Sequence, residues 1–312
     1  QREAARVVGL LAELEQGITP TTAANLFQQD RLKQLLAESQ HYFQKNLENG
    51  QYAWIYKKWG FTKDQADKLG LGYAPPVERG LFTYLKSVGF SIDEIISTGL
   101  ISVIPRGSGI ELSILYYDLL QGRITLPYRT IKNEPIYFTG RETPWVTRDE
   151  GKYKKQIIHS DKHQHVSKFI FQPLYGKHTL EQWLARDSFI VLSEGITDAM
   201  SLELWEIPTV SPVTTNFSSS QLKECLDILE KFDATHMVPI YICFDEEDSY
   251  AGLKGAINTA ELIPDNWDVY LVRLPLLEGQ SKLDINEYFA SGKTREDFME
   301  LAVWAQSKQL QH

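Results

Sequence analysis

The chain has 312 residues, of which 43% are hydrophobic and 23% charged, and it carries a net charge of −9. This composition is typical of a folded globule and argues against a disordered or fibrous chain. No apolar run reaches the roughly 18 residues of a membrane span, and the short apolar run near the N-terminus is not typical of a signal peptide. A chain of this length is expected to fold as two packed domains. Because it does not begin with Met and shows neither of these segments, we expect a cytoplasmic protein cut from a longer one.

The first third of the chain is predicted to be helical. A long amphipathic helix is expected over residues 22–48, followed by short helices at 50–58, 63–69, 80–88 and 92–98. Thr62 with Gln65, and Ser91 with Glu94, have the spacing of capping boxes, which satisfy backbone donors at a helix start. Strands are predicted next at 111–118, 123–130 and 134–141, and residues 142–168 are predicted to form a surface loop.

From residue 187 onward, strands and helices alternate. Strands are predicted at 189–193, 209–212, 237–244 and 268–274, and helices at 198–205, 219–232, 252–262 and 294–308. This order predicts an α/β domain with a parallel sheet flanked by helices. We therefore predict a mixed α+β domain over residues 1–186 and an α/β domain over residues 187–312.

Acidic residues follow two of the predicted strands. Glu194 ends the first, and the run Asp245-Glu246-Glu247-Asp248 ends another. The carboxyl ends of parallel strands open onto one edge of the sheet, where carboxylates bind Mg²⁺ or Mn²⁺. Taken alone, the acidic run also fits a solvated turn, and Asp198 also fits a favourable charge in the first turn of a helix.

Residues 122–168 are basic within an acidic chain. They hold ten basic and five acidic residues, a net charge of +5. A local phosphate-binding surface would have this charge, although a solvated face would too. The candidate contacts are Arg123, Arg129, Arg141, Lys152, Lys154, Lys155 and Lys168, with Tyr153 and Trp145 as candidates for base stacking.

Zinc is not expected in this chain. Its two cysteines, Cys225 and Cys243, cannot build a four-cysteine site, and we interpret them as reduced core thiols. His159, His163 and His165 have the spacing of a metal cluster, but neither a cysteine nor a further carboxylate completes a ligand shell.

Several motifs occur in a fixed order along the chain. The upstream ones are Leu69–Pro75, Gly122–Arg129, Thr139–Arg141 and Pro173–Gly176. The downstream ones are Glu194-Gly195 with Asp198, the acidic run before Ala251-Gly252, and the segment Lys282-Leu-Asp284-Ile-Asn286-Glu287-Tyr288. The downstream motifs resemble a TOPRIM domain, and all of them together resemble the catalytic core of bacterial-type (DnaG-like) DNA primases over roughly residues 25–310.

The resemblance implies a TOPRIM parallel sheet preceded by an α+β primase N-terminal subdomain. It implies a DNA-directed RNA polymerase that makes short RNA primers on single-stranded DNA from ribonucleoside triphosphates, with two Mg²⁺ or Mn²⁺ ions. A replicative helicase would bind through regions outside this chain. Among the site residues, it implies metal ligands from Asp245, Glu247 or Asp248, and Asp284, and a ligand or proton acceptor in Glu194. It also places Arg123 and Arg141 beside the active site and Lys152-Tyr153 in the nucleotide-binding segment.

The chain departs from the family pattern in three ways. Two extra residues separate Asp245 from Gly252, so the choice between Glu247 and Asp248 stays open; Asn286 replaces an aspartate; and no zinc ribbon precedes the core. Two alternatives therefore remain. One is another TOPRIM enzyme, a nuclease or topoisomerase, although a Walker motif is absent. The other is a primase-like binding module without catalysis. A plasmid, phage or other mobile element is the candidate source.

Overall fold

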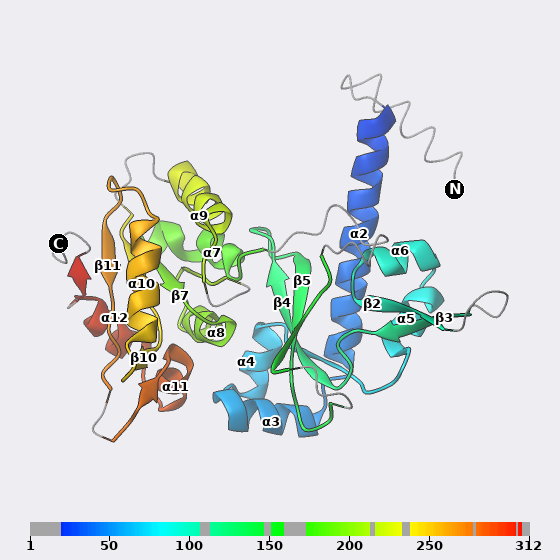
Figure 1. The fold of residues 1–312 in the computed structure, drawn as a ribbon, viewed down its shortest axis with the longest axis horizontal. Helices are drawn as coiled ribbons and strands as arrows, with labels where there is room; N and C mark the ends of the chain where they lie inside the picture. Colours follow the sequence, from blue (N-terminus) through cyan, green and yellow to red (C-terminus); the bar gives the residue numbers. More distant parts are fainter. Residues whose placement is uncertain are drawn as a thin grey trace. The chain divides into compact units, whose positions relative to one another are not determined.

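The computed structural model describes residues 20–106, 113–146, 151–158, 173–212, 216–232, 238–276, 279–303 and 305–307. They form two compact units (Figure 1). Unit 1 is drawn from the residues up to 47 and from 71–127 and 135–171, and unit 2 from 48–70, 128–134 and 172–312. The chain thus passes between the units more than once, and the predicted domain boundary after residue 186 stays a prediction.

Unit 1 is organised around one long helix, α2 (Pro20–Lys45), as predicted. Leu32, Leu35, Leu36 and Phe43 recur at helical spacing and are buried, and the helix packs on β1 (Gly72–Ala74) and β5 (Pro135–Arg141). The predicted short helices are α5 (Gly80–Ser87) and α6 (Ile92–Ser97), and Ser91 and Glu94 form the predicted capping box. No helix that the structure describes, α2 included, is long and apolar enough to span a membrane.

The strands of unit 1 form a four-stranded sheet and a two-stranded ribbon. The sheet has the order β1-β4-β5-β6, with β4 at Arg123–Arg129 and β6 at Tyr153–Lys155. The ribbon pairs β2 (Ile101–Arg106) with β3 (Ser113–Asp118). The prediction of a loop is wrong for β6, because this strand pairs antiparallel with residues 139–141 of β5. Residues 147–150 and 159–168 of the predicted loop lie outside the described residues.

Unit 2 contains the predicted parallel sheet. Its order is β13-β11-β9-β7-β8, where β7 (Ile190–Ser193), β8 (Thr209–Val210), β9 (Ile240–Cys243) and β11 (Val269–Leu271) run parallel. β13 (Gln306–Ser307) adds an antiparallel edge. The unit also holds α3 (Asn49–Trp59), α4 (Lys63–Lys68) and α7 (Lys177–Asp187). The α/β fold class predicted from the alternation is confirmed.

Apolar side chains cover both faces of this sheet. Ile190 and Ile242 belong to a core with residues of α7, α9 (Ser219–Phe232) and α10 (Ala251–Glu261). Val191 and Cys243, one position away in each strand, belong to a second core with α8 (Ile196–Leu204), α11 (Ile285–Ala290) and α12 (Arg295–Val303). Because a strand sends successive side chains to opposite faces, continuous apolar runs suit a sheet buried on both sides.

Candidate active site

Three carboxylates meet at one edge of the unit 2 sheet. Asp198, Asp245 and Asp284 each offer an oxygen atom that lies within 4.8 Å of the other two. Asp198 lies in the first turn of α8, directly after β7; Asp245 follows β9; and Asp284 is the N-cap residue of α11. Carboxylate oxygens are the ligands that hard divalent cations prefer, so this donor set fits Mg²⁺ or Mn²⁺.

Burial and mutual repulsion shape the electrostatics of this cluster. Burial, followed by the charges of Asp284 and Asp245, raises the pKa of Asp198 well above its usual range. Burial raises the pKa of Asp284 to about 6, and burial together with the charge of Asp245 raises the pKa of Glu194. Negative charges that are held together away from water resist ionisation. A divalent cation would remove this penalty.

Asp198 has structural partners as well as a place in the cluster. It is 4% exposed; one carboxylate oxygen accepts a hydrogen bond from the backbone N–H of Gly195 (3.1 Å), and the other accepts one from that of Asn286 (3.0 Å). In the sequence, Asp198 also fits a favourable charge at a helix start, so Asp198 is not among the predicted ligands. The contact that brings Asp198 close to Asp284 is made by the tertiary fold and leaves no local signal in the sequence.

The acidic run after β9 continues as a short strand, β10 (Glu246–Glu247), which pairs antiparallel with β12 (Lys282–Leu283). Successive side chains of a strand point to opposite sides. Glu246 is buried and forms two charged hydrogen bonds with the Arg273 guanidinium. This pair keeps Glu246 in a structural role.

Glu247 is better placed for the cluster than Asp248. It pairs opposite Lys282, is half-buried, and lies close enough for its charge to raise the pKa of Glu194, after the larger effects of burial and Asp245. Asp248 is exposed, and its backbone N–H donates a hydrogen bond to the carbonyl of Ser281 (3.2 Å). The structure therefore favours Glu247 for the role that the sequence left open.

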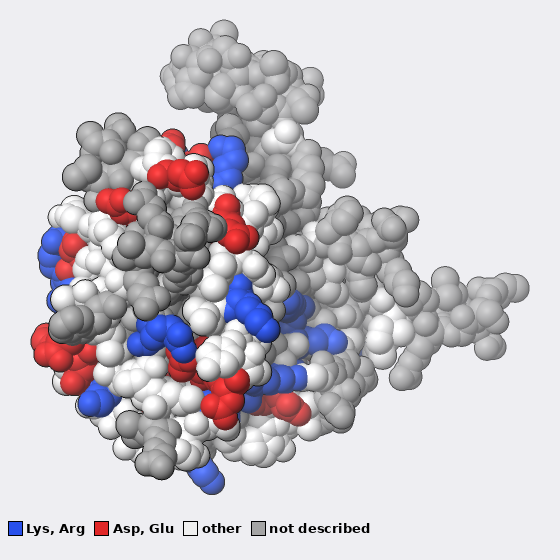
Figure 2. Space-filling model, turned by 60° about the vertical axis from the view of Figure 1, so that its left-hand side comes forward, with Lys and Arg blue, Asp and Glu red and all other residues white. Residues whose placement is uncertain are grey.

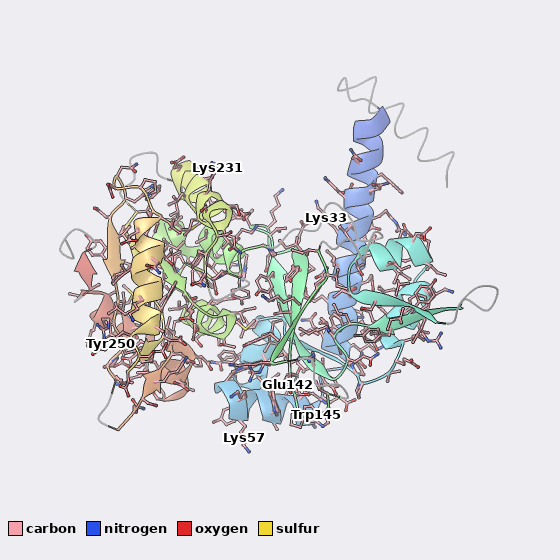
Figure 3. All side chains as sticks on the ribbon, viewed as in Figure 1. Lys33, Lys57, Glu142, Trp145, Lys231 and Tyr250 are labelled. Carbon is pink, nitrogen blue, oxygen red and sulfur yellow. The ribbon has the colours of Figure 1, made fainter. Side chains whose placement is uncertain are left out.

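The loop after the acidic run enters α10 through a left-handed residue and a close backbone approach. Tyr250, labelled in Figure 3, has a left-handed backbone (φ 57°) and is 55% exposed. Two residues on, a Cβ on Gly252 would lie 2.0 Å from the carbonyl oxygen of Asp245. Because only glycine lacks that atom, Gly252 lets α10 begin directly against the residue that offers the ligand.

Asn286, which replaces an aspartate of the family pattern, has a structural role. It is 6% exposed, and its side-chain amide donates hydrogen bonds to the Trp59 carbonyl and to the Ser201 hydroxyl, both 3.0 Å. An ionised carboxylate has no hydrogen to donate to either. The amide therefore links α11 to the end of α3 and to α8 in a way that an aspartate cannot.

We predict that Asn286→Asp lowers the free energy of unfolding by about 2–4 kcal/mol, because it buries a carboxylate against a carbonyl oxygen and beside Asp198. Urea unfolding at neutral pH measures this change. The matched control is Asn258→Asp on the exposed side of α10, which should stay within about 0.5 kcal/mol of the parent. Equal stability of the two variants would show that the amide hydrogen bonds contribute little.

The predicted nucleic-acid contacts in unit 1 differ in exposure. Arg123 is buried, and its guanidinium donates to the Gly151 carbonyl (2.9 Å). Arg141 is also buried, with its guanidinium carbon 5.1 Å from the centre of the Tyr153 ring. Lys152 and Lys155 are exposed and Lys154 is half-buried, whereas Lys168 lies outside the described residues. The exposed lysines are thus accessible to a phosphate, whereas Arg123 is hydrogen-bonded to the backbone and Arg141 is buried against the Tyr153 ring.

The side chains of Trp145 and Arg129 contact other residues of their own units. Trp145, labelled in Figure 3, packs edge-on against Tyr73, with ring centres 5.8 Å apart. Arg129 is 6% exposed; it pairs with Glu203 at 3.6 Å and donates to the Leu69 carbonyl. Binding a phosphate would require Arg129 to leave these partners, so its position favours a structural role.

Figure 2 shows acidic and basic side chains interspersed over the visible face.

Comparisons with known proteins agree with this architecture. The family described as DNA primase catalytic core, N-terminal domain, matches residues 40–166. A DNA primase of Staphylococcus epidermidis is 24% identical over 286 residues, which is 88% of this chain and 42% of the relative.

Two solved structures have the same fold. The zinc-binding and RNA polymerase domains of Aquifex aeolicus primase align with a TM-score of 0.68 at 20% identity, covering 96% of this chain and 70% of that one. A DnaG primase catalytic domain bound to single-stranded DNA aligns with a TM-score of 0.64 at 19% identity, covering 91% and 81%.

Together, the fold and the sequence are similar to those of DNA primase catalytic cores. The solved structures with this fold include catalytic cores of the DnaG type. The chain spans less than half the length of the curated DNA primases that it matches.

Proposed function

We propose that this chain catalyses template-directed synthesis of short RNA primers on single-stranded DNA, with Mg²⁺ or Mn²⁺ as cofactor. The observation that carries the proposal is the group of three carboxylates at the carboxyl edge of the parallel sheet, within a primase-core fold. Ligands bind at that edge in α/β sheets. A structural neighbour bound to single-stranded DNA supports the choice of template.

The proposed chemistry is attack of a 3′-hydroxyl on the α-phosphate of a ribonucleoside triphosphate, which forms a phosphodiester bond, breaks the bond between the α- and β-phosphates and releases pyrophosphate. Two bound divalent ions would stabilise the negative charge on the attacking and leaving oxygens. Asp198, Asp245 and Asp284 would hold them, and hydrogen bonds from Gly195 and Asn286 fix the orientation of Asp198. Glu194 has a raised pKa and would accept the proton of the attacking hydroxyl.

One assay tests this proposal against its alternatives. The protein is incubated with single-stranded DNA, labelled ribonucleotides and Mg²⁺ or Mn²⁺, and the products are separated by size. New labelled oligomers of defined length support primer synthesis. Cleavage of the template would instead indicate a nuclease, and DNA binding with neither product would indicate a module without catalysis.

The role of Glu247 gives a separate prediction. Because Glu247 is half-buried and its charge acts on Glu194, whereas Asp248 is exposed, we expect Glu247→Ala to weaken Mn²⁺ binding about tenfold, which corresponds to about 1.4 kcal/mol, and Asp248→Ala to change it less than about twofold. Calorimetric titration with Mn²⁺ measures both. Equal losses in the two variants would mean that either carboxylate can serve.

The three lysines in and beside β6, two exposed and one half-buried, are proposed to contact the phosphates of the DNA strand. Each contact releases counterions, so the slope of log affinity against log salt is roughly −0.7 per contact. Replacing Lys152, Lys154 and Lys155 together by alanine should make the slope shallower by up to about 2. Fluorescence anisotropy with a labelled oligonucleotide at several salt concentrations measures it.

The control for this experiment removes the same charge elsewhere in unit 1. Lys33 (Figure 3) and Lys45 on α2, and Lys86 on α5, are exposed. Their triple alanine variant is expected to keep the parent slope. If both triple variants lose the same slope, the effect is one of net charge and β6 is not the contact.

A further inference from the structure

A lysine lies within the acidic cluster itself. Lys282, in β12, forms an ion pair with the Asp245 carboxylate. The strand register places Lys282 opposite Glu247, and side chains of directly opposed residues share one side of the ribbon. The other basic residue at this loop, Arg273, is bound to Glu246. Among the described residues, Lys282 is therefore a cation that the fold directs toward a candidate metal ligand.

The contact with Asp245 has consequences for metal binding. The ammonium group donates to a carboxylate oxygen of the residue that contributes to the trio with Asp198 and Asp284. The hydrogen bond uses one of the lone pairs of the carboxylate, and the positive charge of the ammonium repels a divalent cation that approaches the same carboxylate. Lys282 and a metal ion therefore compete for Asp245.

We propose that Lys282 is an internal counter-ion that occupies Asp245 in the metal-free protein and sets the affinity of the site for divalent cations. This inference rests on the proposed metal-dependent function. The Lys282 side chain is 48% exposed, against 14% for Asp245. The ammonium can therefore leave Asp245 for water, where it stays well solvated, without disturbing the core.

The arrangement also explains how this group of partly buried acids is tolerated before a metal binds. Glu194, Asp198, Asp245 and Asp284 influence one another's charge, and like charges gathered away from water destabilise a fold. A lysine that neutralises part of this charge stabilises the metal-free protein and lowers its affinity for metal. The same residue therefore affects both properties in opposite directions.

Calorimetric titration of the full chain with Mn²⁺ tests the proposal. Lys282→Met should bind Mn²⁺ about tenfold more tightly than the parent, because a competing cation is gone. Lys282→Arg keeps the charge and should stay within about twofold of the parent. Lys254→Met, which removes an exposed lysine from α10, should also leave affinity unchanged and so controls for net charge. Lys282→Gln replaces the methionine variant if that variant does not fold.

A second readout needs no metal. In EDTA, Lys282→Met should melt at a lower temperature than the parent, and saturating Mn²⁺ should raise its Tm by more than it raises that of the parent. Unchanged or weaker Mn²⁺ binding by Lys282→Met, with a parent that binds normally, would overturn the role of Lys282 alone. Absence of Mn²⁺ binding in both the parent and Lys282→Met would overturn the metal site and, with it, this inference.

Discussion

Asp245→Ala is expected to lower the rate of primer synthesis at least about 100-fold, while the chain stays folded. Asp245 contributes one of the three clustered carboxylates, and charge stabilisation by bound metal contributes several kcal/mol to such reactions, at about 1.4 kcal/mol per tenfold in rate. Glu194→Ala should have an effect of the same order through loss of the proton acceptor. Incorporation of labelled ribonucleotides on single-stranded DNA measures both.

Thermal melting separates this loss from unfolding. In EDTA, removing Asp245 relieves repulsion within the cluster but also breaks its ion pair with Lys282, so we expect little net change in Tm. Mn²⁺ should raise the Tm of the parent and not that of Asp245→Ala. Asp268→Ala, which removes an exposed carboxylate just before β11 and so at the opposite edge of the sheet, should behave as the parent. Full activity of Asp245→Ala would remove Asp245 from the proposed site.

The parallel sheet and its strand-end acids were predictable because both depend on local pattern. β7 and β9 are short apolar runs, each followed within a few residues by an acid, and parallel strands open onto a common edge. The neighbouring parallel strands, β8 and β11, were predictable from the alternation of strands and helices alone. Where the position of a residue follows from its place on a strand, the sequence is sufficient to predict that position.

Other parts of the site depended on contacts that the sequence does not encode locally. The short pairing of β10 with β12 separates Glu246, Glu247 and Asp248 into three environments, although they are adjacent acids in the chain. Arg123 was predicted to face a phosphate, but a strand covered on both sides buries a long side chain with its guanidinium against backbone carbonyls. In both cases the partner is remote in sequence.

A buried ionic network holds Arg129 in unit 2 and is centred on Glu203 of α8. The Glu203 carboxylate is 3% exposed; it accepts a hydrogen bond from the Tyr175 hydroxyl, lies 3.0 Å from Nε2 of His178 and 3.6 Å from Nη1 of Arg129. Burial opposes ionisation, but His178, Arg129 and Tyr175 together lower the pKa of Glu203. Glu203 is therefore ionised in the fold and compensates the charge of Arg129.

Glu203→Ala is expected to lower the free energy of unfolding by about 3–5 kcal/mol, because it leaves the Arg129 guanidinium buried without its carboxylate. The folded pKa of Glu203 is lowered, so its contribution to the free energy of unfolding is present above the unfolded pKa of about 4.3 and is lost as the pH falls from there through the folded pKa. Parent and variant should therefore converge in stability toward low pH. Urea unfolding at pH 7 and below measures both effects. Glu261→Ala, at the exposed end of α10, should stay within about 0.5 kcal/mol of the parent. A Glu203→Ala variant as stable as this control would show that Arg129 finds another partner, and Arg129 would then be free to act as the phosphate contact that the sequence suggested.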